Sequence, residues 1–186
     1  MRVIAGRAKG HRLAGPASRG TRPTSDLVRG AVFSALEAMG AELTRTRDLD
    51  AGSGARGIEA LSRGAQWCDF GEKDGRACAS IRANLTRTGF EGQAKVHCAP
   101  VERALPTGRQ ARGRLEGPYT LVLADPPYAS EATPVLERLV GSGLVEAGRT
   151  VLALEHSSRE EGPERLGGLS RVRTLRHGDS AVSIYR

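Results

Sequence analysis

The most distinctive group of residues is Asp125-Pro126-Pro127-Tyr128, which directly follows the apolar segment 121–124. The Asp125 carboxylate and the Pro126 carbonyl can accept both N–H bonds of an aromatic amine and direct its lone pair at an electrophile. The two prolines stiffen the loop, as a preorganised site requires, and Tyr128 offers a ring on which a flipped-out base can stack. We interpret these four residues as catalytic. The alternative is a proline-rich strand end with an aromatic lid.

A second group forms the turn Asp48-Leu49-Asp50-Ala51-Gly52-Ser53-Gly54-Ala55-Arg56-Gly57. Its glycines permit a tight turn and let a ligand approach the backbone closely. Glu72 follows 20 residues after Gly52 and ends the next predicted strand, where a carboxylate can bind a ribose diol. The combination indicates a nucleoside-containing cofactor but does not say which one. The alternative is a structural turn with a solvated Glu72.

Alternating strands and helices must position both groups. Apolar residues at helical spacing predict a helix over 27–39, capped by Thr24, Ser25 or Asp26. Further helices are expected near 55–64, 77–88, 100–105 and 131–140, and strands near 48–50, 66–71, 94–98, 119–124, 149–155, 170–176 and 181–185. This order predicts an α/β fold with a mostly parallel seven-stranded sheet and helices on both faces. Its ligand should lie beyond the carboxyl ends of the strands.

Positive charge is concentrated at the start of the chain. The net charge is +7, and residues 1–30 contain seven Lys or Arg against one acidic residue. Arg2-Val3-Ile4-Ala5-Gly6 and Gly10-His11-Arg12-Leu13 are predicted to be short strands around a turn. A basic hairpin on a nearly neutral body indicates a polyanionic partner. The alternative is a solvated basic tail.

Other features narrow the class of protein. A length of 186 residues suits one domain with room for a small appendage. Cys68, Cys78 and Cys98 show no C-x-x-C spacing, so we expect neither a disulfide framework nor a zinc site, and no metal is assigned. The chain has no apolar run long enough for a membrane helix and no signal-like start, so a cytoplasmic location is expected.

These motifs resemble class I S-adenosylmethionine-dependent methyltransferases that act on amino groups. More narrowly, the chain resembles the bacterial 16S ribosomal RNA guanine-N2 methyltransferases that act at guanine 966. The resemblance covers nearly the whole chain. Beyond the two groups, it is carried by Arg2–Gly6 with Lys9-Gly10, Thr21–Arg29, Gly57–Ala65, Glu72-Lys73-Asp74, Asn84-Leu85, Glu155-His156 and Gly178–Val182.

The resemblance implies a Rossmann-like methyltransferase domain over 25–186 and an RNA-binding β-hairpin arm over 1–24. It implies methylation of the exocyclic N2 of a guanine in 16S ribosomal RNA, within a small-subunit assembly particle, by a monomer. The implied S-adenosylmethionine site comprises Thr24, Asp48, Ala51, Gly52, Ser53, Gly54, Glu72, Lys73, Val101 and Asp125. The implied RNA contacts are Arg2, Arg7, Lys9, Arg12 and Arg22.

Four positions depart from the pattern of that family. Asp50 replaces an aromatic residue, Arg56 a small or apolar residue, and Gly30 a Glu. Pro100 stands where an Asp or Asn often meets the adenine amine, although Val101 keeps a backbone N–H for that contact. Other hypotheses are an adenine-N6 or cytosine-N4 nucleic-acid methyltransferase, a non-catalytic RNA-binding relative, and a nicotinamide-dependent oxidoreductase.

Overall fold

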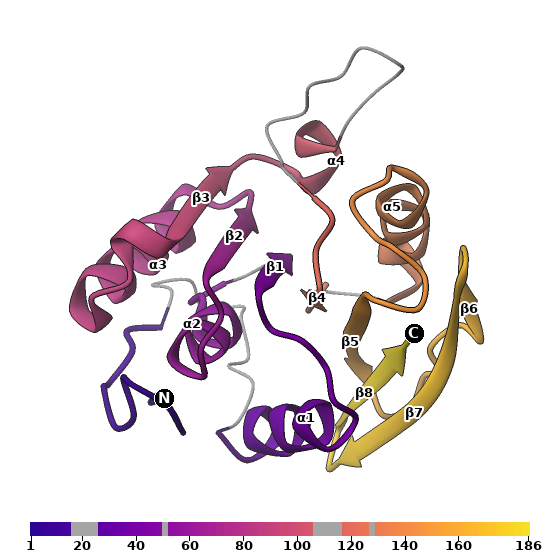
Figure 1. The fold of residues 1–186 in the computed structure, drawn as a ribbon, viewed down its shortest axis with the longest axis horizontal. Coiled ribbons are helices and arrows are strands. Elements are labelled where there is room, and N and C mark those ends of the chain that lie inside the picture. Colours follow the sequence, from indigo (N-terminus) through magenta and orange to yellow (C-terminus); the bar gives the residue numbers. More distant parts are fainter. Residues whose placement is uncertain (16–25, 50–51, 106–116, 127–128) are drawn as a thin grey trace.

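The computed structural model describes residues 1–15, 26–49, 52–105, 117–126 and 129–186. Helices and strands alternate along most of this part of the chain (Figure 1). In order, they are α1 (Asp26–Ala38), β1 (Arg45–Leu49), α2 (Ala55–Ser62), β2 (Trp67–Glu72), α3 (Gly75–Thr88), the 3-10 turn η1 (Glu91–Gln93), β3 (Ala94–Cys98), α4 (Val101–Ala104), β4 (Leu121–Ala124), α5 (Ala129–Gly141), β5 (Val151–Ser157), β6 (Arg165–Leu166), β7 (Leu169–His177) and β8 (Ser180–Tyr185).

A single sheet organises the fold, in the strand order β3-β2-β1-β4-β5-β8-β7-β6. The first five strands in this order run parallel, while β8, β7 and β6 add antiparallel pairs. The mostly parallel α/β sheet predicted from the sequence is therefore confirmed. The described residues form eight strands rather than seven, because the two-residue strand β6 pairs with the start of β7.

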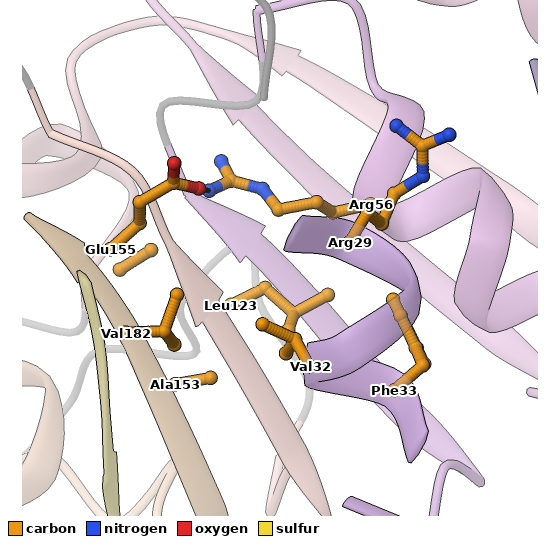
Figure 2. A pocket seen from close by; sticks show the side chains of 9 residues that line it. Arg29, Val32, Phe33, Arg56, Leu123, Ala153, Glu155 and Val182 are labelled. Atoms are coloured by element: carbon orange, nitrogen blue, oxygen red, sulfur yellow. Dashed lines mark hydrogen bonds and ion pairs between the residues drawn. The ribbon is translucent and has the colours of Figure 1, made fainter. Parts of the chain in front are cut away.

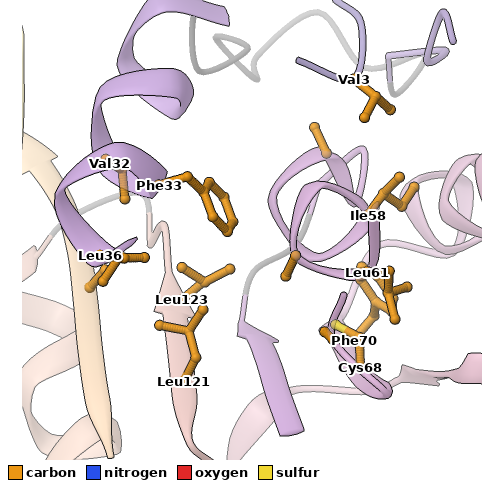
Figure 3. Packing of buried hydrophobic residues seen from close by; sticks show 14 of the residues in the cluster. Val3, Val32, Phe33, Leu36, Ile58, Leu61, Cys68, Phe70, Leu121 and Leu123 are labelled. Carbon is orange, nitrogen blue, oxygen red and sulfur yellow. The ribbon is translucent and has the colours of Figure 1, made fainter. Parts of the chain in front are cut away.

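The helices cover the two faces of the sheet, with α1, α2 and α3 on one side and α4 and α5 on the other (Figure 1). On the first face, Phe33 and Leu36 of α1 pack toward Leu121 and Leu123 of β4 (Figure 3). On the second face, the alternate β4 residue Val122 belongs to a separate apolar cluster. This alternation follows from the two-residue period of a strand, so each strand contributes side chains to both layers.

Strand β1 begins three residues before the predicted strand at 48–50. Its sequence, Arg45-Thr46-Arg47-Asp48-Leu49, lacks the apolar run of a central strand, yet Thr46, Arg47 and Asp48 are buried. Because β1 pairs with a parallel strand on each side, it lies inside the sheet, where its side chains face the covered faces. The sequence pattern therefore placed the strand too late.

The N-terminal arm is a hairpin closed by antiparallel pairing of Arg2 with Arg12. Its apolar side chains belong to the main core, whereas its basic side chains are exposed. Helix α2 holds its backbone: the Glu59 carboxylate accepts hydrogen bonds from the amides of Ile4 and Ala5 at 2.8 and 3.0 Å. The arm is therefore docked on the body of the protein through defined contacts.

A disulfide joins Cys78 of α3 to Cys98 at the end of β3. The prediction from cysteine spacing, which argued against disulfides, was wrong for this pair, while Cys68 is a buried free thiol. Because α3 packs over β2 and β3, the Cα atoms of Cys78 and Cys98 approach to 6.0 Å despite 20 residues of separation. Spacing along the sequence does not reveal this approach.

We predict that Glu59→Gln lowers the free energy of unfolding by about 3–5 kcal/mol, because it removes the only one of Arg29's two carboxylate partners among the described residues that is itself fully buried; the other, Asp26, is 39% exposed. Glu59 also pairs with Arg63. Glu37→Gln is the matched control: it removes a half-exposed carboxylate from the same Arg63 and should cost less than about 1 kcal/mol. Urea denaturation of both variants measures the difference, and equal losses would contradict it.

Candidate functional site

The site lies where the strand order reverses. Strand β1 pairs with β2 on one side and with β4 on the other, so the carboxyl ends of these strands meet at one edge of the sheet. Asp48 lies near the end of β1, in register with Leu123 of β4, and Asp125 follows β4. Such a reversal opens the crevice in which α/β sheets bind ligands. The structure therefore brings together two residues that lie 77 positions apart.

The glycine-rich turn connects β1 to α2 by close packing. Gly54 has a φ of 73°, in the left-handed region that glycine adopts without strain. A Cβ on Gly57 would lie 2.3 Å from the Phe70 ring, so this position requires glycine for α2 to approach β2. A Cβ on Gly52, by contrast, would have none of the described residues within 4 Å apart from its chain neighbours. The turn is thus closely packed at Gly57, on the side of β2, and open at Gly52.

Glu72 lies at the end of β2, as predicted, and its carboxylate is tied to the turn. Glu72 Oε2 accepts the Gly52 amide at 2.9 Å, and Oε1 accepts the Asp74 amide at 2.8 Å. Each carboxylate oxygen has a further lone pair. The two bonds therefore fix the orientation of Glu72 and leave acceptor capacity for a diol.

Asp48 is fully buried, and its two oxygens have different surroundings. Oδ2 accepts the Gly57 amide at 3.0 Å, whereas Oδ1 has no hydrogen-bond partner in the described part of the chain. Burial raises the pKa of Asp48 to about 6, although Arg56 and the Gly57 amide oppose this rise. Asp48 is thus an acceptor held in place but not fully satisfied.

Arg56, the second residue of α2, lies among three carboxylates. Its guanidinium nitrogens approach Asp48 Oδ1 at 3.5 Å, Asp125 Oδ2 at 3.3 Å and Glu155 Oε2 at 3.5 Å. Figure 2 shows the Arg56 side chain reaching Glu155 at one end of a pocket. The remaining lining of this pocket is Arg29, Val32, Phe33, Leu123, Ala124, Ala153 and Val182.

The other predicted site residues have mixed outcomes. Ser53 lies in the turn, where its carbonyl accepts a hydrogen bond from Asn84. Lys73 is exposed and directly follows Glu72. Val101 is buried at the start of α4. Pro126 directly follows Asp125. The predicted residues Arg22, Thr24, Ala51, Pro127 and Tyr128 lie outside the described residues.

Glu155 and His156 do not form an acid–base pair. Successive residues of a strand point to opposite faces. Glu155 faces Arg56, while the His156 ring lies within hydrogen-bond distance of Ser183 Oγ, at 2.9 Å, and of the Ser157 carbonyl. Among the described residues, no cluster of His, Cys, Asp and Glu is arranged to hold a metal, and no helix is long and apolar enough to cross a membrane.

Sequence reasoning missed the roles of three residues. Arg56 was noted only as a departure, Glu155 only as part of a dipeptide, and Asn84 only within the resemblance. Asn84 donates to the Ser53 carbonyl and binds both backbone groups of Ala14, so it connects the turn to the N-terminal arm. No local pattern signals the contacts of Asn84, because each joins residues 31 or more positions apart.

Comparison with known proteins assigns the family. The family described as conserved hypothetical protein 95 matches residues 1–186, the whole chain. This chain belongs to that family. YlbH of Bacillus subtilis, provisionally named an rRNA methyltransferase, is 34% identical over 186 residues, covering 100% of this chain and 98% of YlbH. Ribosomal RNA small subunit methyltransferase D of Escherichia coli K12 is 34% identical over 128 residues, which is 69% of this chain and 60% of the relative.

Solved structures agree with this assignment. The E. coli protein yhhF, provisionally named a methyltransferase, has a TM-score of 0.81 at 26% identity and covers 100% of this chain and 96% of its own. A hypothetical protein of Thermus thermophilus has a TM-score of 0.80 at 32% identity, covering 99% of this chain and 98% of its own. The predicted family and class I methyltransferase fold are confirmed, and S-adenosylmethionine is the cofactor of this fold.

The residues of the site fit this cofactor. The open surface of the turn at Gly52 admits a ligand, and Glu72 keeps acceptor capacity beside it. Among the described residues, Asp48 Oδ1 accepts no hydrogen bond and has only an ion-pair contact with Arg56 at 3.5 Å, so it keeps acceptor capacity that an ammonium group of the methionine end would use.

We predict that Glu72→Ala weakens binding of S-adenosylmethionine by at least about tenfold, because it removes the carboxylate beside the turn. Isothermal titration calorimetry measures the affinity. Glu91→Ala, which removes an exposed carboxylate from η1, is the control and should leave it unchanged. Equal affinity of Glu72→Ala and wild type, or a preference for NAD, would contradict the assignment.

Proposed function

We propose that this protein transfers the methyl group of S-adenosylmethionine to the exocyclic N2 of a guanine in the 16S ribosomal RNA of the small subunit. The observation that carries the proposal is the position of Asp125. Its carboxylate is 35% exposed at the strand-order reversal, directly after β4 and beside the cofactor turn. The name of the E. coli relative, an rRNA small subunit methyltransferase, supports this substrate.

In this proposal one set of site residues binds the cofactor and another binds the target base. When bound, S-adenosylmethionine supplies an electrophilic methyl group on a sulfonium centre. Asp48 and the turn Gly52–Gly54 hold its methionine end, Glu72 its ribose, and the Val101 amide its adenine. Asp125 and the Pro126 carbonyl accept the N–H bonds of the target amine, so that its lone pair faces the methyl group.

Asp125 acts in this proposal as an acceptor rather than as a proton-abstracting base. An ordinary carboxylate is far too weak to deprotonate a neutral aromatic amine before attack. During transfer the nitrogen becomes positively charged, and a fixed carboxylate stabilises this charge. The methylated nitrogen then loses its proton readily. The negative charge of Asp125 and the direction of its oxygens are therefore the properties that matter.

We also propose that the arm over 1–24 binds RNA and that 25–186 forms the methyltransferase domain of a monomeric cytoplasmic protein. The contacts of the described part of the arm support its assignment to RNA binding. Glu59 of α2 and Asn84 of α3 fix its backbone. The side chains of Arg2, Arg7, Lys9 and Arg12 are exposed. A polyanion would thus meet a preorganised set of cations.

We predict that Asp125→Ala lowers the single-turnover rate of methyl transfer by about a hundred- to a thousandfold, while cofactor affinity changes much less. Asp125→Asn keeps an acceptor oxygen but loses the charge, so its rate should lie between those of Asp125→Ala and wild type. The assay uses labelled S-adenosylmethionine with 16S RNA and small-subunit particles from cells lacking the enzyme. Mapping the product separates guanine N2 from adenine N6 and cytosine N4. Near-normal transfer by Asp125→Ala would refute the site.

We predict that exposed charges of the arm dominate the salt dependence of RNA binding. If about four phosphates are neutralised, log affinity should fall with log salt at a slope near −3, from about 0.7 per contact. Replacing Arg2, Lys9 and Arg12 together by Gln should flatten the slope by about 2. Substitution is preferred to deletion because the arm also carries core residues.

A matched control removes the same charge elsewhere. Replacing Arg159, Arg165 and Arg173 by Gln changes three exposed arginines near and within the β6–β7 edge of the sheet. It should leave the slope unchanged. If both triple variants flattened the slope equally, nonspecific charge rather than the arm would bind RNA.

A further inference from the structure

Arg56 joins the ends of three neighbouring strands of the sheet. Asp48 belongs to β1, Asp125 follows β4, and Glu155 belongs to β5; all three lie within 3.3–3.5 Å of its guanidinium. Only 10% of the Arg56 side chain is exposed. A guanidinium in such a position is a fixed part of the site and not a surface side chain that meets solvent.

The three carboxylates need a counter-charge. Asp48 is fully buried, Glu155 is 11% exposed and Asp125 is 35% exposed, so solvent screens them unequally. Carboxylates that share a site cannot all remain ionised without a nearby cation. The other groups acting on Asp48 are Arg47 on its own strand and the Gly57 amide, and Asp48 in turn disfavours ionisation of the buried Cys68 thiol.

We propose that Arg56 is a positioning residue of the transfer site, where one guanidinium keeps Asp48, Asp125 and Glu155 ionised side by side and fixes the Asp125 carboxylate through Oδ2. This inference rests on the proposed function, because it assigns Asp125 the target amine. With Oδ2 held by Arg56, Oδ1 is the oxygen for the amine. Because Arg56 is shared among three anions, the cluster keeps a net negative charge for the cation that develops during transfer.

Carboxyl carbon NMR titration tests the charge role without cofactor or RNA. In wild type the Asp48 carboxyl should titrate near pH 6, since burial raises its pKa to about 6. Arg56→Leu should raise this midpoint by at least about one unit, because the carboxylates then repel one another without a counter-ion. Arg56→Lys should largely restore it, and Glu155→Gln should lower it. Arg63→Leu, which removes another ion-paired arginine of the α2 region, should not move it.

Single-turnover methyl transfer at pH 6.5 and pH 9 tests the positioning role. Arg56→Leu should be at least about tenfold slower than wild type at pH 6.5, and the defect should shrink at pH 9, where the Asp48 carboxyl ionises again. Arg56→Lys should retain most of the rate at both pH values. A purely structural role would give the same defect at both.

Two results would overturn the inference. One is an Asp48 titration midpoint that is the same in Arg56→Leu and wild type. The other is a transfer defect that does not depend on pH or is not rescued by Arg56→Lys. Absence of methyl transfer by the wild-type protein would instead refute the proposed function, whereas the titration still decides whether Arg56 is the counter-ion of the cluster.

Discussion

Parallel pairing of β1 with both β2 and β4 is the constraint on which the rest of the structure depends. It brings the carboxyl ends of adjacent strands to one edge of the sheet, so acidic residues from distant parts of the chain converge there. Acidic groups that converge at a partly buried edge repel one another. The positive charge of Arg56 lies among these acidic groups. Arg56 belongs to α2, the helix that directly follows the glycine-rich turn. The glycine-rich turn, Asp125 and Arg56, to which we assign cofactor binding, amine binding and charge balance, therefore lie within one electrostatic unit.

Helix α2 also connects this unit to the N-terminal arm. All eight of its residues are buried, and they serve different neighbours. Arg56 faces the carboxylates and Gly57 lets the helix approach Phe70, while Glu59 and Ser62 accept hydrogen bonds from the backbone of the arm. A polar residue that is fully buried needs partners on every side. The exposed basic side chains of the arm are thus held at a fixed position relative to the site in which the base would react.

Much of this arrangement was predictable from the sequence. The alternation of strands and helices, the parallel sheet, Glu72 at the end of β2 and Asp125 after β4 all follow from local patterns of apolar residues, glycine and proline. Strand β1 was placed too late and β6 was missed, because a buried polar strand and a two-residue strand leave little periodicity to detect. The Cys78–Cys98 disulfide was missed because its partners meet only when α3 packs over β3.

The sequence by itself determined which acceptor groups the candidate site contains. Residue type decides whether an oxygen accepts a proton or an N–H bond, and Asp125-Pro126 and Glu72 carry that information locally. Only the tertiary structure decided which charges act together. Arg56 lies 69 residues from Asp125 and 99 from Glu155, and no local pattern relates them. Electrostatic coupling depends on distance in space and on burial, and both are set only when the strands pair and α2 packs against the sheet.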